Sequence, residues 1–110
     1  MTVEQPDEID IVGIERNTGL FVLTIADHLD WDELEEHMRI LEAKVESYIA
    51  FIDSGHVLEE HPLSAGRGIA ISLVFRVTPP DSAATFFDRL RERVEGAGHE
   101  IRTMTFPFAS

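Results

Sequence analysis

Histidine and acidic residues gather just after the first predicted helix, in a pattern that partly matches a metal-binding motif. His56 and His61 enclose Glu59 and Glu60. Zinc proteases carry two histidines at positions i and i+4 of one helix, so that both rings reach the metal. Here the histidines are five residues apart, and they lie between a helix stop and Pro62. Although a loop can bring two imidazoles together, we expect no metal site and no cofactor.

His28 is the second candidate, because it lies between Asp27 and Asp30 where a strand is predicted to turn into a helix. Ligands often bind beyond the carboxyl ends of strands in α/β sheets, and a helix N-terminus offers free N–H groups. A histidine beside two carboxylates is suited to act as a general base. However, the nearby sequence offers no nucleophile, and Asp30 and Trp31 are explained as a helix cap and a core residue. We therefore favour a structural role for this segment.

The glycine-rich run from Ser64 to Gly68 indicates a flexible loop that enters a strand. It lacks the spacing and the lysine of a phosphate-binding loop. No serine of the chain lies in a nucleophile-elbow pattern. We therefore expect no catalytic residues, and an enzyme that uses the His28 loop and the loop His56–Arg67 is the weakest of three hypotheses.

The charge of the chain is strongly negative and uneven. Nine basic residues stand against 21 acidic ones, which gives a net charge of −12. Residues 1–66 hold 16 acids and 3 bases, whereas residues 67–110 hold 5 acids and 6 bases. Such a surface repels phosphate backbones and anionic lipids, so we expect neither nucleic acid nor membrane as a partner. Two interpretations remain: a solvated face that keeps the protein soluble, and a surface that attracts a basic protein partner.

Length and composition predict a single domain. A chain of 110 residues can bury a core without disulfide or metal, and the absence of cysteine fits a reducing compartment. The first residues are acidic, unlike a signal peptide, and no apolar run approaches the roughly 20 residues that span a bilayer. We expect a loose N-terminal segment at residues 1–8, one domain at residues 9–110 and a cytoplasmic location.

Hydrophobic patterning predicts elements in the order ββαβαβ. Strands are expected at residues 9–15, 20–26, 67–78 and 99–106, a long helix at 31–54, and a second helix from about Pro79 to Gly96. The turn at 16–19 makes a hairpin of the first two strands, and 56–68 is expected to be a loop. Right-handed crossovers place both helices on one face of a four-stranded mixed sheet. The predicted fold class is therefore α+β, a two-layer sandwich.

The first helix carries the clearest local signals. Asp30 and Glu33 have the spacing of a capping box, and Gly55 supplies a stop. Apolar residues recur every three or four positions, which places them on one face: Trp31, Leu34, Met38, Leu41, Val45, Tyr48 and Ile52. The acids outside this stripe form the surface that we expect to contact a basic partner; they are Asp32, Glu35, Glu36, Glu42 and Glu46.

The second face of the sheet is predicted to carry apolar residues as well. A sheet face that is open to water normally shows polar residues, and a large apolar patch usually marks an interface. We therefore expect a two-fold homodimer, although terminal residues can also cover this face within one chain. The residues expected in the contact are Val22, Val74, Met104 and Phe106.

Familiar sequence patterns occur at residues 19–31, at residues 48–55 and in the run around Pro62, Gly66, Arg67 and Phe75. Together they resemble a family of short, acidic bacterial proteins catalogued as a domain of unknown function. The resemblance extends from Ile9 to Phe106. It implies a single bacterial domain, and it implies no activity.

The leading functional hypothesis is a non-catalytic protein-binding or regulatory domain that acts through contacts with a basic partner. The alternative is a structural homo-oligomer that carries a small ligand. The third hypothesis is the enzyme described above.

Overall fold

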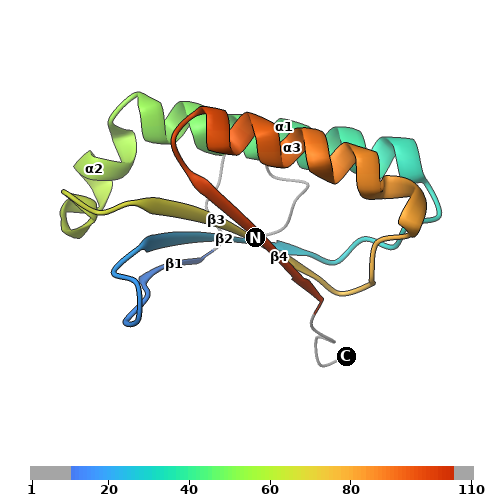
Figure 1. Ribbon diagram of the computed structural model, residues 1–110, viewed down its shortest axis with the longest axis horizontal. Coiled ribbons are helices and arrows are strands. Elements are labelled where there is room, and N and C mark those ends of the chain that lie inside the picture. The colour runs from blue at the N-terminus through green and yellow to red at the C-terminus, as the bar shows by residue number, and fades with distance from the viewer. Residues whose placement is uncertain (1–10, 106–110) are drawn as a thin grey trace.

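The computed structural model describes residues 11–105, which form one four-stranded sheet with helices over it (Figure 1). The strands β1 (Ile11–Ile14), β2 (Phe21–Asp27), β3 (Ile69–Phe75) and β4 (Glu100–Thr105) lie side by side in that order. β1 is antiparallel to β2, while β2, β3 and β4 are parallel. The predicted mixed sheet is thus confirmed. The predicted segment 1–8 and strand residues 9, 10 and 106 lie outside the described residues.

Two main helices form the second layer of the fold. α1 (Leu34–Asp53) and α3 (Ala84–Gly96) cover the same face of the sheet, as the right-handed crossovers predict (Figure 1). A short helix, α2 (His56–Glu60), continues this layer beyond the end of α1. Two 3₁₀ turns, η1 (Pro62–Ser64) and η2 (Asp81–Ala83), complete the described elements.

The hydrophobic core lies between the sheet and the helices. Alternate residues of β2 are buried because one face of the strand packs against the helices and successive side chains point to opposite faces. The core residues on the strands are Phe21, Leu23, Ile25, Ile71, Leu73, Phe75 and Ile101, and those on α1 and α3 are Leu41, Val45, Tyr48, Ile49, Phe86, Leu90 and Val94.

α1 begins at Leu34, three residues later than the sequence predicts. The predicted capping box is wrong. The carboxylate of Asp30 accepts a hydrogen bond from the N–H of Asp32 (3.1 Å), which forms a local turn instead of a helix cap. The N-cap residue is Glu33, and its side chain makes no capping hydrogen bond. The predicted stop is confirmed, because Gly55 follows the helix with a φ of +88° that side chains rarely adopt.

The predicted loop at residues 56–68 is partly helical instead. Gly55 turns the chain back into α2, whose Val57 is buried, and Pro62 starts η1 at a position where its missing N–H costs nothing. The ring of His61 packs against Phe21, with 5.6 Å between ring centroids. This segment therefore forms a wall beside the first strands.

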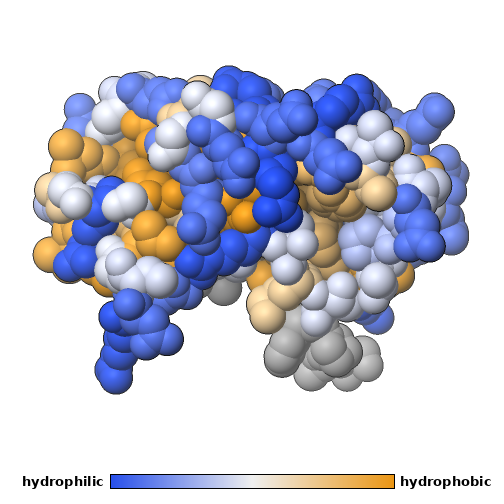
Figure 2. Space-filling model, in the orientation of Figure 1, coloured by the Kyte–Doolittle hydropathy of each residue, from blue (hydrophilic) through white to orange (hydrophobic). Residues whose placement is uncertain are grey.

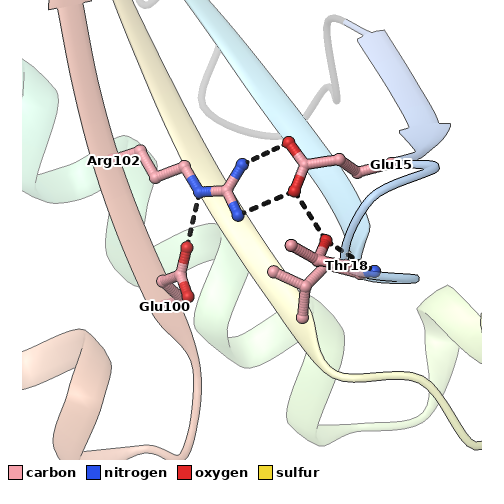
Figure 3. Close-up of polar contacts among 5 residues, drawn as sticks. Glu15, Thr18, Glu100 and Arg102 are labelled. Atoms are coloured by element: carbon pink, nitrogen blue, oxygen red, sulfur yellow. Dashed lines mark hydrogen bonds and ion pairs between the residues drawn. The ribbon is translucent and has the colours of Figure 1, made fainter.

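The face of the sheet opposite the helices is less apolar than the sequence pattern suggests. Thr24, Ser72 and Arg102 are neighbours across β2, β3 and β4, so a polar row crosses the middle of this face. The side chain of Arg102 reaches across the sheet and donates two hydrogen bonds to Glu15, at 2.6 and 3.0 Å (Figure 3). Thr18 also donates to Glu15, at 2.6 Å, and Arg102 donates to Glu100, at 2.5 Å.

The residues expected to mediate self-association lie on both sides of this polar row. Val22 is half-buried on one side, whereas Val74, half-buried, and Met104, exposed, lie on the other. Phe106 lies outside the described residues. Self-association through this face stays a prediction.

Candidate functional site

Two titratable side chains meet in the interior where β2 ends and α1 begins. Asp27 is the last residue of β2, and His37 lies in the first turn of α1; their side chains are 0% and 2% exposed. Asp27 Oδ2 is hydrogen-bonded to His37 Nε2, while Asp27 Oδ1 accepts the N–H of Leu29 at 3.0 Å. The other ring nitrogen, Nδ1, lies 2.8 Å from the carbonyl oxygen of Asp30. The pair thus ties together the strand, the turn and the helix.

The hydrogen bonds fix much of the protonation of this pair. A carbonyl oxygen only accepts, so His37 Nδ1 carries a hydrogen and donates to Asp30. One further proton is then shared between His37 Nε2 and Asp27 Oδ2. Burial raises the pKa of Asp27, although the hydrogen bonds from His37 and Leu29 oppose this effect. The shared proton lies either on the carboxyl group or on the ring. In either arrangement, no imidazole nitrogen is left to accept a proton from a substrate.

Trp31 covers the buried pair. Its ring stacks on the imidazole of His37, with centroids 3.7 Å apart and planes inclined by 22°, and its Nε1–H donates to the carbonyl of Val77 at 2.9 Å. The same ring contacts Phe75 and Phe87. Trp31 is therefore half-buried and packs against the core, which is a structural role.

A pocket of about 320 Å³ opens beside the pair, at the start of α1. Three carboxylates and two histidines surround it, with two aliphatic side chains between them; the lining residues are His28, Leu29, Asp30, Glu33, Glu36, His37 and Ile40. Within residues 11–105 no group of three or more histidine, aspartate or glutamate side chains is arranged to hold a metal ion. The charge and the aliphatic lining suit the side chain of a lysine or an arginine.

The five acids predicted to contact a basic partner do not form one uniform surface. Asp32 and Glu35 are exposed near the pocket, and Glu36 lines it. Glu36 also pairs with Arg39 on the helix surface. Glu42 is exposed farther along α1, whereas Glu46 is half-buried and accepts two hydrogen bonds from Arg93 of α3, at 2.9 and 3.0 Å. The acids at the start of α1 are therefore the ones best placed to act together.

The two histidine-containing segments considered from the sequence lie at opposite ends of α1. His28 precedes α1 and His56 follows it, and a helix of 20 residues is about 30 Å long. The ring of His56 stacks on Phe51, and its Nδ1 lies 2.6 Å from the hydroxyl oxygen of Ser54. His61 packs against Phe21 instead. One active site cannot combine the residues at the two ends of α1.

The run from Ser64 to Gly68 has a structural explanation. The guanidinium group of Arg67 donates to the carbonyl oxygens of Leu63 and Gly19, both at 3.0 Å. These bonds join the segment to the β1–β2 turn, where Gly19 has a φ of +74°.

Sequence reasoning missed two polar residues on the inner face of α1, His37 and Lys44. Both are buried, and Lys44 Nζ lies 5.3 Å from the ring centroid of Tyr48. Their positions follow the same three-four spacing as Leu41 and Tyr48, which is the signal that could have found them. A stripe drawn from apolar residues alone passes over them.

A family model described as a family of unknown function, DUF6572, matches residues 1–106. The chain belongs to this family. This match confirms that the family which the sequence resembles is a family of unknown function. Neither a curated protein nor a solved structure matches this DUF6572 chain. Among its residues 11–105, no helix is long and apolar enough to cross a membrane.

Proposed function

We propose that this DUF6572 protein is a non-catalytic binding domain whose partner is a basic protein. The observation that carries the proposal is the acidic pocket at the start of α1. A bacterial, cytoplasmic setting belongs to the same proposal, and it is supported by the family resemblance and by the absence of cysteine.

The lining of the pocket favours a lysine or arginine side chain. Leu29 and Ile40 offer aliphatic surface for the stem of such a side chain, and the carboxylates of Asp30, Glu33 and Glu36 surround its charged head. The ion pair of Glu36 with Arg39 does not prevent this, because both side chains are more than half exposed and such pairs contribute little. Asp32 and Glu35 extend the negative surface beyond the pocket.

The buried pair supports binding over catalysis. Both imidazole nitrogens of His37 are already engaged, so His37, one of the two histidines of the pocket, has no free base to offer. Its hydrogen bonds instead hold the end of β2 and the start of α1 in place. The pocket therefore has a rigid wall, which reduces the ordering cost of binding.

The test reverses the charge of Asp32, Glu35 and Glu36 together, by substitution with lysine. The matched control reverses Asp88, Glu92 and Glu95, which are exposed on α3. Each reversal adds two charges, so both variants move from −12 to −6. A partner captured from the native cell should associate with the α1 variant at least about tenfold more slowly, and with a weaker dependence on salt. The association rate of the control variant should fall much less.

Two outcomes would contradict the proposal. One is a captured partner that binds both variants equally well. The other is a partner whose contact surface is acidic, since two negative surfaces repel each other. Light scattering and circular dichroism of both variants establish that each is folded before the comparison is made.

A further inference from the structure

Among residues 11–105, β1 forms one edge of the sheet, and the hydrogen bonds of the β1–β2 turn show which of its backbone groups point outward. The N–H of Glu15 donates to the carbonyl of Leu20 at 2.9 Å, so the backbone of Glu15 faces β2 as in a hydrogen-bonded pair of the antiparallel ladder, although the N–H of Leu20 donates to the hydroxyl of Thr18 instead. Such pairs alternate along the ladder, which makes Gly13 and Val22 the next one. The N–H and C=O groups of Val12 and Ile14 therefore point away from β2.

The side chains of the same two residues line an apolar groove. A groove of about 450 Å³ separates β1 from the α2–η1 segment, and its lining residues are Val12, Gly13, Ile14, Phe21, Glu60, His61, Pro62 and Leu63. Leu63 is 74% exposed and Ile14 is 38% exposed. Figure 2 shows apolar surface gathered at the end of the molecule where β1 and α2 lie.

We propose that the β1 edge binds an extended segment of a partner protein, which adds a strand to the sheet and places an aliphatic side chain in the groove. An unpaired strand edge offers main-chain hydrogen bonds, and a neighbouring apolar pocket selects the side chain; together these are the elements of strand addition. Val12 and Ile14 provide both elements, since their backbone groups point outward and their side chains form one wall of the groove.

The charge around the groove indicates which kind of partner segment can bind there. Glu60 lines the groove and Glu59 is exposed next to it. The segment that binds should therefore carry lysine or arginine at its ends. A second copy of this chain is disfavoured as the occupant, because its own β1 edge presents the same acids, Glu59 and Glu60, at the contact.

This surface is separate from the acidic pocket. The pocket lies at the first turn of α1, and the groove lies beside the segment that follows its last turn, about 30 Å along the helix. Reversal of Asp32, Glu35 and Glu36 should therefore leave strand addition within about twofold of the wild type in affinity.

The experiment uses short synthetic peptides and hydrogen exchange. The probe alternates valine and threonine around a central leucine and carries lysines at both ends; one control peptide has glutamates at the ends, and a second has a central proline. The lysine peptide should slow the exchange of the Val12 and Ile14 amides and leave the Gly13 amide, which already points to β2, unchanged. Both control peptides should bind at least about tenfold more weakly, because one is repelled and the other cannot complete the ladder.

A pair of matched variants tests whether the peptide binds in the groove. Leu63→Asp places a charge in it, whereas Leu58→Asp places one on α2 at a residue that is 51% exposed and does not line the groove. Leu63→Asp should weaken binding of the lysine peptide at least about tenfold, whereas Leu58→Asp should leave it unchanged. Fluorescence of Trp31 shows that both variants are folded. The proposal would be overturned if both variants lost the same affinity for the lysine peptide, or if the glutamate peptide bound as tightly as the lysine peptide. It would also be overturned, in favour of a second copy as the occupant, if the protection of Val12 and Ile14 rose with protein concentration alone.

Discussion

Replacing Asp27 with alanine should be among the more damaging single changes to the fold. The side chain is fully buried, and its two oxygens are hydrogen-bonded to His37 Nε2 and to the N–H of Leu29. Alanine leaves both of these groups without a partner. A buried polar group that loses its partner costs about 1–3 kcal/mol, so the variant should lose about 2–5 kcal/mol of its free energy of unfolding.

Asparagine at the same position should cost much less, about 1 kcal/mol. Its amide N–H can donate to Nε2 of a neutral His37, and its oxygen can still accept the N–H of Leu29. This expectation applies to the arrangement in which the proton of the pair lies on the carboxyl group; burial raises the pKa of Asp27, which is the effect that favours this arrangement. If the ring carried the proton instead, asparagine would face a buried cation and the loss would approach that of alanine.

Urea unfolding followed by the fluorescence of Trp31, the single tryptophan, measures these differences. With a slope of about 2 kcal/mol per molar urea, the alanine variant should unfold at a midpoint lower by about 1–2.5 M. The control is Asp53→Ala: Asp53 also pairs with a histidine, His99 at 3.2 Å, but is more than half exposed, so its loss should stay below about 1 kcal/mol. Equal losses for Asp27→Ala and Asp27→Asn, or an Asp27→Ala loss no larger than that of the control, would refute the reasoning.

The pH dependence of the free energy of unfolding provides a second test of the same pair. In the unfolded chain Asp27 releases its proton near the ordinary pKa of 3.8, whereas burial raises its pKa in the folded protein. The resulting stabilisation is complete below pH 3.8 and is lost as the pH rises through the raised pKa. Because Asp27→Asn does not titrate, the stability of the wild type relative to this variant should fall as the pH increases above 3.8. A constant or rising difference would contradict the raised pKa of Asp27.

Two further predictions concern the face of the sheet opposite the helices. Hydrogen bonds from Arg102 and Thr18 lower the pKa of Glu15 from 4.5 to about 2, so its stabilisation is present above pH 4.5 and is lost as the pH falls through 2. Acid unfolding followed by circular dichroism should therefore show a wild-type advantage over Glu15→Gln that shrinks across this range, and an advantage that persists unchanged at pH 2 would contradict the assignment. Light scattering with size exclusion should show a two-fold dimer that Val74→Glu converts to a monomer; a monomeric wild type would refute self-association, and a dimeric variant would place the interface elsewhere.

Much of the fold follows from local sequence patterns, because the pattern along one element records which of its faces is buried. The almost wholly apolar run of β2 and the three-four spacing of α1 and α3 predict strands and helices within a few residues of their observed bounds. Gly55 marks the end of α1 because few side chains tolerate its φ of +88°. The handedness of crossovers then places α1 and α3 on one face.

Tertiary contacts decided what the local patterns could not. The start of α1 moved to Leu34 because Asp30 forms its own turn and Trp31 packs on His37, a contact that depends on where β2 ends. The pairing of Asp27 with His37 joins residues ten positions apart, and that of Arg102 with Glu15 joins opposite ends of the chain. Helical spacing can place a polar residue such as His37 on the inner face of its helix, but it does not identify the partner of that residue. Whether a polar residue is exposed, like Asp32, or buried with a partner, like His37, is decided by the elements that fold against it.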